Sequence, residues 1–179
     1  MKKVILGIIL ITIHSNLKAQ TYTPVIDTCS YLQQFTGEWK YVNGTDTIKV
    51  YLRYHRYHST FFGPNDYFDR LWGWYEYKQG NTVVMSNYQN RFTTLPQVVT
   101  ESYTNSHSII MSMPDCADTT RKLIGQMDDL NHPTSTYRIV AELNPTKTQM
   151  VFWHTFTMGN FHNPDIEKTL PQEFILIKQ

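Results

Sequence analysis

The fold class is decided by residues 35–52, which read FTGEWKYVNGTDTIKVYL. Asn43-Gly44 is the pair most typical of a two-residue β-hairpin turn, because both residues tolerate positive φ. From Thr47 to Tyr54, apolar and polar residues alternate with the period of two that characterises a half-buried strand. The stretch therefore predicts two antiparallel strands, Gly37–Val42 and Thr47–Tyr54, joined by a tight turn.

The rest of the chain repeats this pattern of alternating or β-branched runs separated by turn residues. A second hairpin turn is predicted at Gln79-Gly80-Asn81, and Pro145-Thr146 indicates another. Further strands are predicted at Arg70–Lys78, Thr82–Tyr88, Gln97–Tyr103, His107–Met113, Lys122–Met127, Thr136–Asn144, Gln149–Thr157 and Glu173–Lys178. The sequence thus predicts an all-β protein of about ten sequential strands.

Helical patterns are short. Thr28–Phe35 fits one or two turns, and Asn163–Glu167 resembles a capped first turn that Pro171 would end. We therefore expect one or two short helices beside the strands.

Sequential strands joined by short turns favour an up-and-down antiparallel β-barrel of about 8–10 strands, because closure removes exposed sheet edges. The alternative is a β-sandwich of the immunoglobulin type, in which two cysteines bracket a tryptophan. Trp39 does lie between Cys29 and Cys116, but Cys29 falls in a helix-like stretch and Pro114 stands where a tyrosine is expected. We favour the barrel over the sandwich.

Composition excludes several protein classes. The 179 residues are 41% hydrophobic and 17% charged, which is too apolar for a disordered chain. The formal net charge of +1 gives no indication of nucleic-acid binding. No nucleic-acid partner is therefore expected.

The first twenty residues have the pattern of a secretory signal peptide. A basic start at Lys2-Lys3 precedes ten apolar residues, and Ala19 offers a small residue at the cleavage site. Ten apolar residues are too few to span a membrane, so no integral membrane segment is expected in the mature chain. Residues 21–179 are predicted to form a single exported domain, periplasmic or secreted, from a Gram-negative bacterium.

Export decides how the two cysteines are interpreted. In an oxidising compartment, Cys29 and Cys116 most simply form one disulfide. A catalytic cysteine with a histidine base is the alternative, and six histidines remain in residues 21–179. We favour the disulfide.

Catalytic and cofactor-binding motifs are missing from the sequence. No G-x-S-x-G, H-E-x-x-H, G-x-x-x-x-G-K or paired C-x-x-C is present. We therefore expect no enzyme activity, no cofactor and no metal site.

One motif is similar to that of a known group of barrels. Gly37-x-Trp39, just after a short helical segment, resembles the G-x-W signature that begins the first strand of lipocalins. In that family the tryptophan closes one end of the barrel beneath a basic side chain from the last strand. The resemblance implies that Lys178 lies over Trp39, within about 6 Å of its ring centroid as in a cation–π contact.

A broader resemblance covers nearly all of residues 21–179. Phe35-x-Gly37-x-Trp39, Asn43-Gly44 and the run 69–77, DRLWGWYEY, look like an uncharacterised family of small exported Bacteroidota proteins. The Lys-Lys signal ending at Ala19-Gln20 is similar to the secretion signals of that group. The resemblance implies a lipocalin-like barrel and no established activity.

The parity of the predicted strands suggests an inner face rich in methionine and aromatic residues, which suits adaptable apolar binding as well as a filled core. Our first hypothesis is therefore a non-enzymatic binding protein for a small apolar or amphipathic ligand. Its predicted ligand-binding residues are Leu52, Met111, Tyr137, Met150, Phe152 and His154, lining a cavity of about 300 Å³ or more.

The second hypothesis is a protein-interaction or inhibitor module that acts through the barrel loops. The loop from Tyr57 to Phe68 is rich in aromatic residues around Gly63-Pro64, and such residues often anchor a protein partner.

Overall fold

A computed structural model describes residues 26–60, 66–99, 106–113, 116–117, 122–132, 135–155 and 169–179. The predicted signal peptide, the tip of the loop from Tyr57 to Phe68 and the predicted turn at Asn163–Glu167 lie outside the described residues. The strands are β1 (Gly37–Asn43), β2 (Asp46–Ser59), β3 (Tyr67–Gln79), β4 (Thr82–Ser86), β5 (Val98–Val99), β6 (Ile109–Ser112), β7 (Lys122–Asp128), β8 (Thr136–Leu143), β9 (Gln149–Thr155) and β10 (Glu173–Lys178). Two 3₁₀ helices, η1 (Leu32–Phe35) and η2 (Tyr88–Phe92), accompany them.

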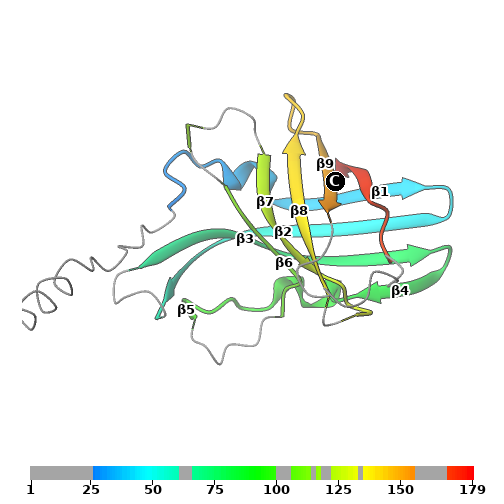
Figure 1. The fold of residues 1–179 in the computed structure, drawn as a ribbon, viewed down its shortest axis with the longest axis horizontal. Helices are drawn as coiled ribbons and strands as arrows, with labels where there is room; N and C mark the ends of the chain where they lie inside the picture. The colour runs from blue at the N-terminus through cyan, green and yellow to red at the C-terminus, as the bar shows by residue number, and fades with distance from the viewer. Residues whose placement is uncertain are drawn as a thin grey trace, which may run out of the picture.

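Eight of these strands close into an antiparallel up-and-down barrel. The pairing runs β3-β6-β7-β8-β9-β10-β1-β2, and β2 pairs with β3 to complete the ring. Figure 1 shows β1, β2 and β3 crossing the direction of β7, β8 and β9, so the barrel wall bends between them. The closed ring confirms the predicted barrel and excludes the sandwich.

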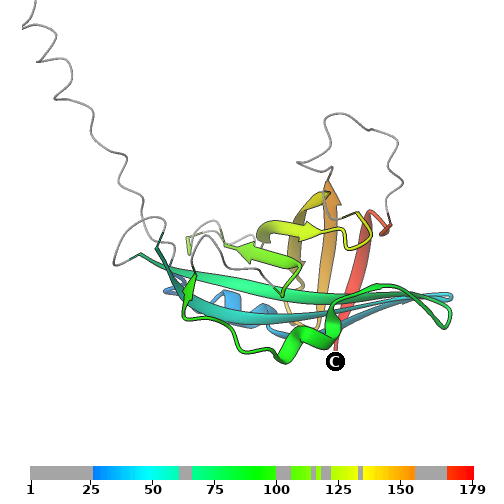
Figure 2. The same cartoon turned by 90° about the horizontal axis from the view of Figure 1, so that it is seen from below.

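Two strands lie outside the ring. β4 pairs with β3 over Glu76–Gln79, where β3 has left β6, and β5 adds a short parallel pairing to β2. In Figure 2 the segment from β4 to β5, which includes η2, runs beneath the long β2 and β3 strands. It covers the outer face of those two strands.

Alternation along the strands fills the barrel interior. Aligned inner residues such as Val50 and Tyr75, or Ile139 and His154, face one another across neighbouring strands and are nearly solvent-free. The apolar inner residues form one cluster, to which the 3₁₀ helix η1 contributes Leu32 and Phe35 at one end. Burial of this cluster is the main source of stability.

A second, smaller core lies on the outer side of β2 and β3. Trp72 and Trp74 point outward from β3 but are buried beneath Leu95 of the covering segment. The His107 ring stacks on Trp72 at 4.1 Å between centroids, and His55 lies 4.6 Å from the same indole. The covering segment thus makes an outward strand face into a buried one.

Candidate functional site

The six residues predicted to line a cavity all lie inside the barrel. Leu52, Met111, Tyr137, Met150 and Phe152 belong to the main apolar cluster, each at most 2% exposed. The sixth, His154, is 1% exposed; its Nε2 lies 2.9 Å from the Pro171 carbonyl oxygen, and its ring lies 4.5 Å from that of Tyr137. The fold therefore brings the six together, and their role in ligand binding stays a prediction.

Trp39 lies at the base of the barrel. Its side chain is fully buried, and its indole Nε1 donates a hydrogen bond to the Phe35 carbonyl at 2.8 Å. Lys178 Nζ lies 5.2 Å from the Trp39 ring centroid, and the two residues are register partners on β10 and β1. Gly37 enters β1 with φ of 115°, a backbone conformation that glycine adopts readily. These residues fix the junction of η1, β1 and β10.

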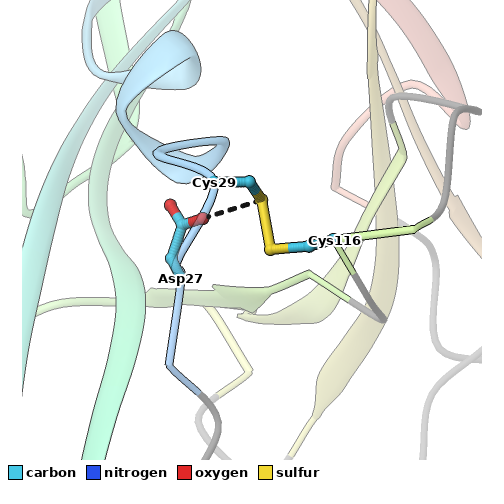
Figure 3. Close-up of side chains that lie close together, drawn as sticks. All are labelled: Asp27, Cys29 and Cys116. Carbon is cyan, nitrogen blue, oxygen red and sulfur yellow. Dashed lines mark hydrogen bonds between the residues drawn. A yellow bond between two sulfur atoms is a disulfide. The ribbon is translucent and has the colours of Figure 1, made fainter.

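A disulfide joins Cys29 to Cys116, with their Cα atoms 5.9 Å apart (Figure 3). Asp27 lies beside it, its Oδ1 3.2 Å from Cys29 Sγ. This is the one cluster of three potential metal ligands within the described residues. Both sulfurs are in the disulfide, and the Asp27 oxygens accept the backbone N–H groups of Tyr31 and Leu32 at 2.9 and 2.8 Å. The cluster is structural rather than a metal centre.

A buried carboxylate, paired with a half-exposed arginine, ties this N-terminal segment to the barrel. Asp69 is fully buried and accepts two hydrogen bonds from Arg56, one from Tyr54 and one from the Asp27 backbone N–H, each at 2.7 Å. Burial acts to raise the pKa of Asp69, but these hydrogen bonds outweigh it and hold the pKa below its ordinary value. Burial and Asp69 raise the pKa of Tyr54 to about 12.

A groove of about 290 Å³ lies on the outer wall of the barrel. It crosses four neighbouring strands, from β3 through β6 and β7 to β8. We call it the arginine groove; its walls are Arg70, Ile110, Met111, Ser112, Ile124, Gly125, Gln126 and Arg138.

The strand register explains the composition of the arginine groove. Gln126 faces Ile110 on one side and Arg138 on the other, and Ile124 faces Ser112. These outward positions place an apolar strip between polar residues. The volume of the arginine groove, about 290 Å³, is at the lower end of the range for small-molecule sites.

Glycine is required at the centre of the groove. A Cβ at Gly125 would collide with the backbone of Ile110 and Met111, so β6 and β7 approach closely only because no side chain is present.

Two arginines face each other across the arginine groove. Three strand spacings of about 4.8 Å separate the backbones of β3 and β8, a span of about 14 Å. Arg70 packs over the Phe68 ring at 5.5 Å and donates a hydrogen bond to the Asp69 backbone carbonyl at 3.0 Å. Neither Arg70 nor Arg138 forms an ion pair with any residue that the structure describes.

The guanidinium groups of Arg70 and Arg138 give the arginine groove a positive charge. A guanidinium binds a carboxylate or phosphate through two parallel hydrogen bonds. An apolar strip between two such groups therefore suits a ligand with an anionic head and an apolar body.

Sequence reasoning missed Arg70 and Arg138. Strand parity marks both as outward-facing, and that signal was available. Both arginines line one groove because β3 lies next to β6, and only the closed ring reveals that neighbourhood.

These features define a closed eight-stranded antiparallel β-barrel with two described pockets at its wall. The chain belongs to the family of unknown function DUF6705, whose match covers residues 1–179. Neither the curated proteins nor the solved structures give a match to it. Among the described residues, no helix has the length and apolar character to cross a membrane.

Proposed function

We propose that this protein is an exported, non-enzymatic binding protein for a small amphipathic ligand. The observation that carries the proposal is the arginine groove, where Arg70 and Arg138 flank an apolar strip and form no ion pair with a described carboxylate. The ligand class that fits is a short-chain carboxylate or a comparable anionic amphiphile. The disulfide supports the exported location, because disulfides persist in oxidising compartments.

The relationship to lipocalins is part of the same proposal. The Gly37-x-Trp39 motif and the Lys178 contact over Trp39 support it. In this proposal the binding surface differs from the interior expected from the sequence, since the interior residues pack against one another. The Lys-Lys signal sequence supports an origin in Bacteroidota.

Octanoate binding tests the proposal, with octanol as an uncharged ligand of the same length. Displacement of an environment-sensitive dye should show saturable octanoate binding and at least tenfold weaker octanol binding. The Arg70→Gln/Arg138→Gln variant should lose about tenfold in octanoate affinity, because two charge-assisted contacts are removed. Added salt should weaken binding to the wild type, since the arginines are solvent-accessible.

Two variants separate the arginine groove from the interior. Phe152→Trp enlarges a side chain inside the barrel and should leave octanoate affinity unchanged if circular dichroism shows a folded protein. Loss of binding in Phe152→Trp but not in the double arginine variant would place the ligand inside the barrel and reject the groove. Equal binding of octanol and octanoate would also reject it.

A protein partner is a second candidate, favoured by one observation. Tyr67, at the start of β3 beside the loop from Tyr57 to Phe68, is 48% exposed, although its aromatic neighbour Phe68 is buried. An exposed tyrosine at the end of a long hairpin is a common anchor for a protein partner. Replacing Tyr67 with Ser should abolish binding of such a partner and leave octanoate binding intact.

A further inference from the structure

A second pocket lies where β3 changes partners. β3 pairs with β6 over Leu71–Gly73 and with β4 over Glu76–Gln79, which leaves a gap in the wall around Tyr75. Asn87 bridges that gap: its Oδ1 accepts the Tyr75 N–H at 3.0 Å, and its Nδ2 donates to the Ser106 carbonyl at 3.2 Å. A pocket of about 330 Å³ opens beside this bridge. We call it the wall pocket.

The lining of the wall pocket is polar and acidic. It consists of Asn87, Asn90, Ser106, His107, Ser108, Asp128, Asp129 and Leu130, with no lysine or arginine. Three chain segments supply these residues: the segment after β4, the segment before β6 and the end of β7. The wall pocket therefore has the opposite electrostatic character to the arginine groove.

Some of these groups are already satisfied by the protein. Asp129 accepts hydrogen bonds from the Tyr137 hydroxyl at 2.5 Å and from the Asn131 and His132 backbone N–H groups at 2.9 and 3.2 Å. The Thr169 hydroxyl adds another at 3.2 Å. Asp129 thus holds the turn after β7, and its carboxylate has little capacity left for a ligand.

Other polar groups of the wall pocket have no such partners in the described part of the chain. His107 is 6% exposed, and its buried Nδ1 has no hydrogen bond to any residue that the structure describes; the same holds for the buried Ser106 hydroxyl. Within the described residues the Asn90 side chain makes no hydrogen bond, and the Asp128 carboxylate accepts only the Thr136 hydroxyl, at 3.4 Å. Buried polar groups without a partner are costly, so the His107 Nδ1 and the Ser106 hydroxyl favour a ligand that can bond to them.

The protonation of His107 limits what the ligand can be. Burial, together with repulsion from His55, lowers the pKa of His107 to about 4. At neutral pH the imidazole is therefore uncharged, and one of its ring nitrogens can accept a hydrogen bond from a ligand. Asp128 is open to solvent, although desolvation raises its pKa. An acidic wall with an uncharged histidine favours a cation that donates hydrogen bonds.

We propose that the wall pocket binds a small organic cation with a primary ammonium group. Its charge would pair with Asp128, while Ser106, Asn90 and His107 accept its hydrogen bonds. A metal ion fits less well, because the acidic and histidine ligand atoms of this pocket do not converge in the described part of the chain. The site is separate from the arginine groove and does not depend on it.

Butylamine is the probe, and butanol is its uncharged control of the same size. Titration followed by ligand-observed NMR at pH 7 should give saturable butylamine binding and at least tenfold weaker butanol binding. Asp128→Asn keeps the shape of the side chain and should weaken butylamine binding about tenfold. Glu173→Gln, which removes an exposed carboxylate on β10, should leave it unchanged.

Several outcomes would overturn the proposal. Equal affinity for butanol would show that charge is not recognised, and unchanged affinity in Asp128→Asn would show that the amine binds elsewhere. Displacement of butylamine by an equal concentration of Ca²⁺ would identify a metal site instead. The Arg70→Gln/Arg138→Gln variant should bind butylamine as the wild type does, so failure of the arginine groove would not affect this result.

Discussion

At the scale of single residues, Trp39 shows how a local motif fixes the structure. The resemblance of Gly37-x-Trp39 to the motif at the start of the first lipocalin strand placed the tryptophan at a barrel end, and it is fully buried. Its hydrogen-bond partner, Phe35, is close in sequence. Its cation–π partner, Lys178, lies near the C-terminus. The Trp39 side chain therefore contacts both the segment before the first strand, β1, and the last strand, β10.

Replacing Trp39 with Ala should lower the free energy of unfolding by about 3–5 kcal/mol, because a large buried aromatic is lost and leaves a cavity. Lys178→Ala should cost about 0.5–1 kcal/mol, since the exposed cation–π contact is weak. Urea unfolding monitored by circular dichroism measures both. A Trp39→Ala variant as stable as the wild type would show that the barrel end does not depend on the indole.

Asp69 makes stability depend on pH. Its pKa is lower in the folded protein than the ordinary value of about 3.9, so its contribution is fully present above that pH and is lost as the pH falls through the folded-state pKa. The free energy of unfolding should therefore decrease below about pH 4. Asp69→Asn should flatten this acid limb when urea unfolding is repeated across the pH range.

At pH 7, Asp69→Asn should also cost about 2–3 kcal/mol, at the low end for a buried pair because Arg56 is half-exposed. Asp66→Asn, three residues earlier in the chain, is the matched control and should change neither value. An Asp69→Asn variant with the wild-type acid limb would mean that another carboxylate, such as buried Asp129, dominates.

At the scale of elements, the alternating pattern predicted most strands and misjudged their ends. The second strand was expected to end at Tyr54 but continues to Ser59, because His55, Tyr57 and their neighbours pair with the equally long β3. The strand expected over Thr82–Tyr88 ends at Ser86, because Asn87 turns the chain and η2 follows. Tertiary pairing, which a local pattern does not contain, sets these ends.

The disulfide is the element-scale feature with the clearest energetic consequence. It links the segment before η1 to the segment after β6, across 87 residues of sequence. Closing a loop of that length restricts the unfolded chain, and the Cys29→Ser/Cys116→Ser variant should lose about 2–4 kcal/mol of stability. Urea unfolding of the oxidised wild type and of the variant, both without reductant, measures the difference.

Thiol titration of unreduced, denatured protein is the companion measurement. It should find no free thiol in the wild type. Two reactive thiols per chain would contradict the disulfide and return Cys29 to consideration as a nucleophile.

At the scale of the whole molecule, the sequence did not predict the complete strand order, in which β3 lies next to β6. Parity predicted that Ile139 and Met150 face inward, and they do. It could not predict that Trp72 and Trp74 would be covered on their outward face, because the segment that contains Leu95 is irregular and shows no periodic pattern. The pockets depend on the same information, since each is built from strands or loops that only the closed ring brings together.

The location of a bound anionic amphiphile tests the central claim most directly, and isoleucine methyl groups report it. Ile110 and Ile124 lie in the arginine groove, whereas Ile48 and Ile139 lie inside the barrel. In a methyl NMR titration with octanoate, the account predicts saturable shifts at Ile110 and Ile124 and none at Ile48 and Ile139. Shifts at Ile48 and Ile139 without shifts at Ile124 would contradict it and place the ligand in the barrel interior.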